Sequence, residues 1–187
     1  MIFDTIDYLQ NGNDRQQRVY EMLVRHQVMN KLADFDPILV GTIPIEVDIE
    51  TSDLDIICCF SDPQVFNEVI FRNFGTQNGF TLQNKLISGV QTVVSRFELD
   101  EFQWEIFGQA IPTLHQMGYR HLVIEYHLLH MFGEEFRQRI VALKRSGYKT
   151  EPAFARLLNL SGDPYQALLR YETKEHPVHY FSDGSKA

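Results

Sequence analysis

The chain has few cysteines, no excess of positive charge and no long hydrophobic run. Its two cysteines, Cys58 and Cys59, are neighbours, and adjacent residues of a strand point to opposite faces, so the sequence excludes a disulfide framework. Lys and Arg together number 17 against 25 Asp and Glu, which gives a formal net charge of -8. A basic surface that grips nucleic acid through its phosphates is therefore not evident, and a polymerase or other nucleic-acid enzyme is disfavoured.

The sequence also lacks the segments of a membrane or secreted protein. No run approaches the ~20 apolar residues that span a bilayer. The opening MIFDTIDYLQ carries acidic residues where a signal peptide has a basic end followed by an apolar stretch. With 44% hydrophobic residues in 187 positions, the chain can bury one sizeable core. We therefore expect a cytoplasmic protein of one compact unit, with no membrane partner.

The first half of the chain predicts one helix, two strands and a second helix. Apolar residues recur at helical intervals over residues 14–33. Residues 37–41 and 53–60 are short apolar runs stopped by Gly and by Ser-Asp-Pro, which is typical of central strands. Residues 63–74 begin with a proline suited to the first turn of a helix.

The second half predicts an antiparallel meander followed by helices. Residues 80–107 form three strand-like runs separated by Ser-Gly and Asp-Glu. Beyond residue 112 the periodicity becomes helical, and Thr150 is placed to cap one of the helices. These helices are predicted over residues 115–132, 134–145, 151–158 and 164–171. The order indicates an α+β fold, with residues 1–110 as an α/β core and residues 111–187 as a helical region packed on it.

Two acids at the entrance of one predicted strand are the most informative residues. Asp53 and Asp55 are two apart, so on a strand both side chains point to one face, ~6.6 Å apart along the backbone. Because the strand continues into apolar residues, two like charges at its entrance are costly unless a cation neutralises them. Mg²⁺ prefers such carboxylate oxygens, together with waters and substrate phosphates.

A third acid and a glycine extend this pattern. Glu105 is an isolated acid in an apolar strand. If that strand lies beside the strand of Asp53 and Asp55, three carboxylates can hold two metals in the arrangement used for in-line attack on a phosphate. Upstream, Gly41 and Thr42 end the first strand, where a glycine lets backbone and hydroxyl donors approach a phosphate closely.

Together these motifs resemble the nucleotidyltransferase superfamily typified by DNA polymerase beta. Its pattern is an apolar strand, a glycine and a small residue, then an acid-apolar-acid strand, and later an acid between apolar residues. The matching segments are LVGT at 39–42, DLDI at 53–56 and WEI at 104–106. Thr42 stands where serine or glycine is usual, and it keeps a hydroxyl. The resemblance covers about residues 38 to 107, and the helical remainder resembles a bacterial branch whose substrate is not established.

The resemblance implies a nucleotidyltransferase-like mixed sheet and a reaction that depends on Mg²⁺ or Mn²⁺. The enzyme would move a nucleoside monophosphate from an NTP to a hydroxyl of a small molecule or protein. Asp53 and Asp55 would bind both metals, and Glu105 would help to bind one and assist deprotonation of the acceptor. Gly41 and Thr42 would hold the phosphates.

The sequence leaves two alternatives open. Arg120 and His121 could point into the cleft and meet the triphosphate, or they could be a surface ion-pair residue and a core histidine. The other alternative concerns the whole protein. It could be a non-catalytic nucleotidyltransferase-like module that binds a protein partner, such as the antitoxin-type half of a toxin–antitoxin pair. The sequence names neither the NTP nor the acceptor.

Overall fold

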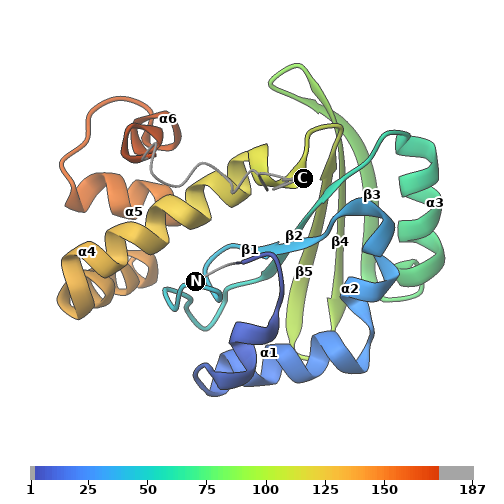
Figure 1. Cartoon of the computed structure of the whole chain (residues 1–187), viewed down its shortest axis with the longest axis horizontal. Helices are drawn as coiled ribbons and strands as arrows, with labels where there is room; N and C mark the ends of the chain where they lie inside the picture. The colour runs from blue at the N-terminus through green and yellow to red at the C-terminus, as the bar shows by residue number, and fades with distance from the viewer. Residues whose placement is uncertain (1–2, 173–187) are drawn as a thin grey trace, which may run out of the picture.

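The computed structural model describes residues 3–172 and contains one five-stranded mixed sheet flanked by helices (Figure 1). The strand order is β1-β2-β5-β4-β3. β2 pairs with β5 in parallel, and the other neighbours are antiparallel. The strands are β1 (Ile38–Val40), β2 (Leu54–Cys59), β3 (Asn78–Ile87), β4 (Val90–Leu99) and β5 (Phe102–Gln109). The predicted meander is confirmed as β3, β4 and β5.

Helices cover both faces of the sheet and form the C-terminal third of the described chain. They are α1 (Asp14–Arg25), α2 (Val28–Lys31), α3 (Pro63–Phe74), α4 (Met117–Arg145), α5 (Thr150–Leu157) and α6 (Pro164–Leu168). Short 3-10 turns lie at Asp7–Asn11, Ala33–Phe35, Thr113–His115 and Leu169–Tyr171. The predicted α+β class is confirmed, while the last part of the predicted helical region, residues 173–187, lies outside the described residues.

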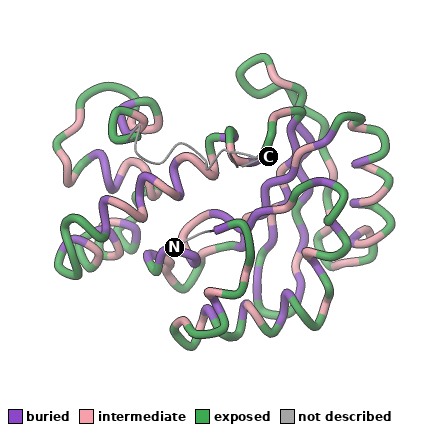
Figure 2. The backbone as a smooth tube through the Cα atoms, in the orientation of Figure 1, coloured by how far each residue is buried: buried purple, intermediate pink, exposed green. Residues whose placement is uncertain are grey.

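Two hydrophobic clusters lie on the two faces of the sheet. Leu54, Ile56 and Cys58 of β2 belong to the cluster that contains residues of α1 and α3. Ile57 belongs to the other cluster, which contains residues of α4 and α5. Figure 2 shows buried positions concentrated along the central strands and on the helix sides that face them. Because side chains of a strand alternate, Asp55 shares the face of Ile57 and therefore lies on the side of α4.

β1 is not the central strand that its apolar run predicts, since it lies at the edge of the sheet and bonds to β2. All three of its residues are nevertheless buried. Leu39 belongs to one hydrophobic cluster, and Ile38 and Val40 belong to the other. Helices covering both faces thus bury an edge strand as completely as strand neighbours would.

The helices also depart from their predicted bounds. The single helix expected over residues 14–33 is divided into α1 and α2 at Gln27, whose φ of 52° is left-handed. The break predicted between two helices at Gly133 is present as a kink inside α4, where φ is 74°. Thr150 does not cap α5 as predicted, because Lys149 holds the N-cap position and no side chain caps that helix.

No helix among residues 3–172 is long and apolar enough to cross a membrane.

Replacing Gln27 by glycine should stabilise the protein. Gln27 is exposed and has a left-handed backbone, which costs roughly 1 kcal/mol for a residue with a Cβ. Glycine removes that strain but enlarges the entropy of the unfolded chain, so we expect a net gain of about 0.5 kcal/mol. Urea unfolding measures this change, and Gln27→Ala should show no gain. A loss of stability in the glycine variant would contradict the expectation.

Candidate active site

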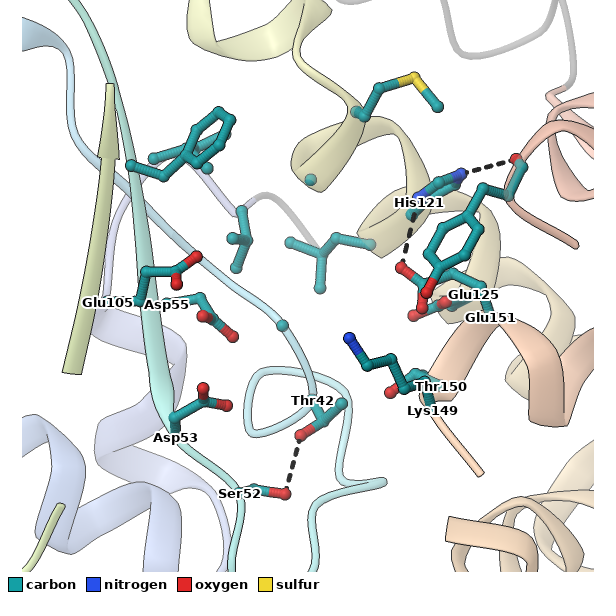
Figure 3. Close-up of a pocket in the computed structure, with 18 of the residues that line it drawn as sticks. Thr42, Ser52, Asp53, Asp55, Glu105, His121, Glu125, Lys149, Thr150 and Glu151 are labelled. Atoms are coloured by element: carbon teal, nitrogen blue, oxygen red, sulfur yellow. Dashed lines mark hydrogen bonds and ion pairs between the residues drawn. The ribbon is translucent and has the colours of Figure 1, made fainter. Parts of the chain in front are cut away.

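The structure brings the three predicted carboxylates together. In the parallel register of β2 and β5, Asp55 pairs with Glu105. Asp53 precedes β2 and is two residues from Asp55. Figure 3 shows all three carboxylates directed toward one space. They line a cavity of about 740 Å³ between the sheet and the α4–α5 region. The predicted adjacency of the two strands is therefore correct, while the metal-binding roles remain predictions.

These carboxylates lie where negative charge is costly. Burial, together with the charges of Asp53, Glu105 and Glu151, raises the pKa of Asp55 from 3.8 to about 8. In the part of the chain that the structure describes, Glu105 alone of the three is ion-paired, because Arg96 lies opposite it on β4. On the sheet side of the cavity, the carboxylates therefore outnumber the cations that are paired with them.

The donor set of this wall fits a hard divalent cation. Among residues 3–172, no group of three or more His, Cys, Asp or Glu side chains is already arranged to hold a metal ion. Mg²⁺ commonly takes only one or two protein carboxylates and fills its other positions with water and phosphate oxygens. Asp53 and Asp55 can supply those carboxylates, and a cation beside Asp55 would reverse the cause of its raised pKa. At such a position Mg²⁺ or Mn²⁺ can bind phosphate oxygens and polarise them.

Gly41 gives Asp55 its space. Gly41 has a φ of +82°, and a Cβ at this position would lie 2.6 Å from Asp55 Oδ2. The next residue, Thr42, lines the cavity, and its hydroxyl donates a hydrogen bond of 3.3 Å to Ser52 Oγ. Ser52 Oγ also accepts the Ile49 N–H at 2.9 Å. Gly41 and Thr42, the predicted phosphate-binding pair, therefore lie at the edge of the cavity, in a turn that these hydrogen bonds hold in place.

Arginines hold the loop between β1 and β2. Arg15 of α1 donates to the Ser52 carbonyl at 3.1 Å and pairs with Asp48 at 3.3 Å. From α4, Arg145 pairs with Glu50 at 2.7 Å. These loop acids are therefore ion-paired with arginine, and neither belongs to the lining of the cavity. Their placement fixes the approach of the chain to Asp53.

The opposite wall comes from α4 and the start of α5. His121 lines the cavity; its Nε2 lies 2.9 Å from the Tyr165 carbonyl oxygen, and its Nδ1 lies 3.5 Å from Glu151 Oε1. His121 is thus buried and hydrogen-bonded, and it still borders the cavity. Glu125 lies on the same wall, and Lys149 extends toward the space between the walls (Figure 3).

Arg120 lies differently from its neighbour. Its guanidinium makes a two-pronged contact with Glu172, at 2.8 Å from Nε and 2.6 Å from the second nitrogen. It is not among the residues that line the cavity. A role for Arg120 in phosphate binding therefore requires that the pair with Glu172 first opens.

Sequence reasoning missed the lysines and one acid of the helical wall. Lys144, Lys149 and Glu151 all line the cavity. None of them stands in a motif, and about 90 residues separate them from Asp53 and Asp55. The glycine that ends α4 and the predicted start of α5 indicated a helix N-terminus here, but nothing in the sequence placed that terminus opposite the carboxylates.

Known structures share this arrangement of sheet and helices. Cid1 poly(U) polymerase with MgGTP bound matches with a TM-score of 0.51 and 8% identity, over 71% of this chain and 42% of that chain. The same protein with Mg 3'-dATP bound gives 0.53 and 9%, over 83% and 48%. A GLD-2/RNP-8 complex gives 0.51 and 11%, over 84% and 63%. The chain spans less than half the length of these Cid1 chains.

The likeness defines the class of fold, which is that of the nucleotidyltransferase superfamily. At such low identities it establishes the fold alone. The chain belongs to the family described as Domain of unknown function (DUF4269), whose model matches residues 21–171. No curated protein matches the sequence.

Proposed function

We propose that the protein is a nucleotidyltransferase that depends on Mg²⁺ or Mn²⁺ and transfers a nucleoside monophosphate from an NTP to a hydroxyl of a small molecule or protein. The observation that carries this proposal is the placement of Asp53, Asp55 and Glu105 on one wall of the cavity. Such a group of acids, of which Glu105 is ion-paired with Arg96, suits divalent metal and phosphate.

In the transfer, the acceptor oxygen forms a bond to the α-phosphorus, and the bond from that phosphorus to the β-phosphate oxygen breaks. Pyrophosphate leaves, and the proton of the acceptor hydroxyl passes toward Glu105. Asp53 and Asp55 would hold Mg²⁺ or Mn²⁺, and Gly41 and Thr42 would hold phosphate oxygens. Positioning the reactants and stabilising charge supply most of the catalysis in such phosphoryl chemistry.

The helical wall would complete nucleotide binding and select the acceptor. The cation of Lys149 suits a phosphate or pyrophosphate group, since it extends toward the cavity. His121 borders the same space, and Arg120 would contribute after releasing Glu172. Cid1 is a poly(U) polymerase whose structures hold MgGTP or Mg 3'-dATP, which favours an NTP as donor here. The net charge of -8 speaks against a nucleic-acid acceptor.

A thermal-shift panel of ATP, GTP, CTP and UTP with Mg²⁺ or Mn²⁺ tests this function. At 100 times its dissociation constant, a nucleotide should stabilise the wild type by about 2.7 kcal/mol. Asp53→Asn/Asp55→Asn should lose the metal-dependent part of that shift. Asp34→Asn, which removes an exposed acid, is the matched control and should keep it.

Two results would contradict the proposal. One is a nucleotide shift that persists in the double variant, which would move the site elsewhere. The other is no shift with any nucleotide, which would favour the non-catalytic interaction module. The GLD-2/RNP-8 complex shows that a protein of this fold can be found with a partner protein, so co-purification of a partner would then be the next measurement.

A further inference from the structure

Glu125 is a buried acid, and one of its two carboxylate oxygens is unpaired within the described residues. It lies on α4, its exposed fraction is 4%, and it belongs to the lining of the cavity. Within residues 3–172, its Oε1 has no hydrogen-bond partner. Leaving such an oxygen unsatisfied in the folded protein costs free energy, so a donor that arrives with a ligand would bind favourably. Most of the other buried residues of α4 are apolar, so a carboxylate at this position is an exception.

The charges around Glu125 leave it short of cations. Glu151, which also lines the cavity, raises the pKa of Glu125 further, in addition to the larger effect of burial. Lys144 is the cation whose charge acts on Glu125, and the same ammonium also interacts with Asp48, Asp53 and Glu151. A hydrogen-bond donor that carries positive charge would satisfy Glu125 and Glu151, whereas these two carboxylates would not bind a phosphate.

The position of this wall separates it from the metal side. Figure 3 shows Glu125 and Glu151 beside His121, across the cavity from Asp53, Asp55 and Glu105. The proposed function places the metal and its bound phosphates at the sheet wall, with Lys149 extending toward them from the helical wall. A second substrate held at the helical wall would therefore approach the phosphates from the opposite side, as transfer to an acceptor requires.

We propose that Glu125 and Glu151 form a subsite for a protonated amine of the acceptor. This inference rests on the proposed function and makes the acceptor an amine-bearing hydroxyl compound. The ammonium donates to the unpartnered oxygen of Glu125 and to Glu151, and it adds positive charge beside these two acids to that of Lys144 and Lys149. A neutral hydroxyl compound of the same length fills the space without that charge.

The probe is 1,4-diaminobutane, with 1,4-butanediol as its neutral counterpart, and calorimetric titration at low salt is the measurement. The wild type should bind the diamine and not the diol. Glu125→Gln and Glu151→Gln should each weaken diamine binding about tenfold or more, as expected for loss of a charged hydrogen bond. Glu151 is partly exposed, so its variant tests the site even if Glu125→Gln fails to fold. Glu135→Gln, exposed on the same helix, is the control.

Two results would overturn the amine site: no diamine binding by the wild type, or equal binding by the wild type and both cavity variants. Mg·ATP is titrated into the wild type in parallel. If Mg·ATP binds and the diamine does not, the inference fails and the proposed function stands. If the diamine binds through Glu125 and no nucleotide binds, nucleotidyl transfer is wrong and the amine site remains.

Discussion

Asp55→Asn is expected to make the folded protein more stable at alkaline pH than the wild type. Burial and the neighbouring acids raise the pKa of Asp55 to about 8 in the folded state, from 3.8. Between these two values the folded chain keeps a proton that the unfolded chain releases, so the stability of the wild type falls as the pH rises from about 4 to about 8. Asparagine has a similar shape and does not titrate.

The gain should be large because each tenfold change in proton affinity corresponds to ~1.4 kcal/mol. Relaxation around the carboxylate reduces the full effect, and we expect a difference on the order of 3 kcal/mol at pH 9 that disappears near pH 4. Urea unfolding at a series of pH values measures it. Mg²⁺ should stabilise the wild type at pH 8 and leave Asp55→Asn unchanged, since the cation replaces the missing positive charge.

Asp34→Asn provides the comparison for this series. Asp34 is exposed, and its variant should follow the wild-type pH dependence. Parallel stability curves for the wild type and Asp55→Asn would show that the pKa of Asp55 is not raised in the folded protein. The main electrostatic argument for a cation site would then be lost. A gain in stability on replacing Asp55 would be an example of the common trade-off between stability and activity at functional residues.

The carboxylate wall could be predicted because its geometry follows from local rules. Asp53 and Asp55 share a face through the two-residue period of a strand, and the apolar residues around Glu105 predicted a neighbouring buried strand. Whether these two strands are neighbours was left open by the sequence, and the structure shows that they pair. Three residues in two short segments were therefore enough to locate one side of the cavity.

The helical wall could not be predicted in the same way. Glu125 and Glu151 meet because α4 and α5 pack together across Gly147, and no period in the sequence encodes that angle. The break at Gln27 was missed for a related reason. The apolar residues continue through it at helical spacing, and the left-handed residue between α1 and α2 is not a glycine. Arg120 likewise found its partner in Glu172, 52 residues away.

Gly41→Ala is expected to destabilise the protein and to disturb the site at the same time. The φ of +82° is costly for alanine, by roughly 1 kcal/mol, and the new Cβ would lie 2.6 Å from Asp55 Oδ2. Asp55 must then rotate within a buried environment, which adds about 1 to 3 kcal/mol. The rotation moves its carboxylate away from the metal position, so the metal-dependent nucleotide shift should also be lost.

Gly79→Ala separates the two contributions. Gly79 also has a positive φ, of +64°, but a Cβ there meets no atom within 4 Å, so its variant should show the backbone cost alone. In an Asp55→Ala background the additional cost of Gly41→Ala should shrink toward that of Gly79→Ala, because the carboxylate that it meets is absent. Urea unfolding of the four chains of this cycle gives the coupling energy directly. A coupling near zero would mean that Gly41 is required for its backbone conformation only, and that the close approach to Asp55 is not part of the site.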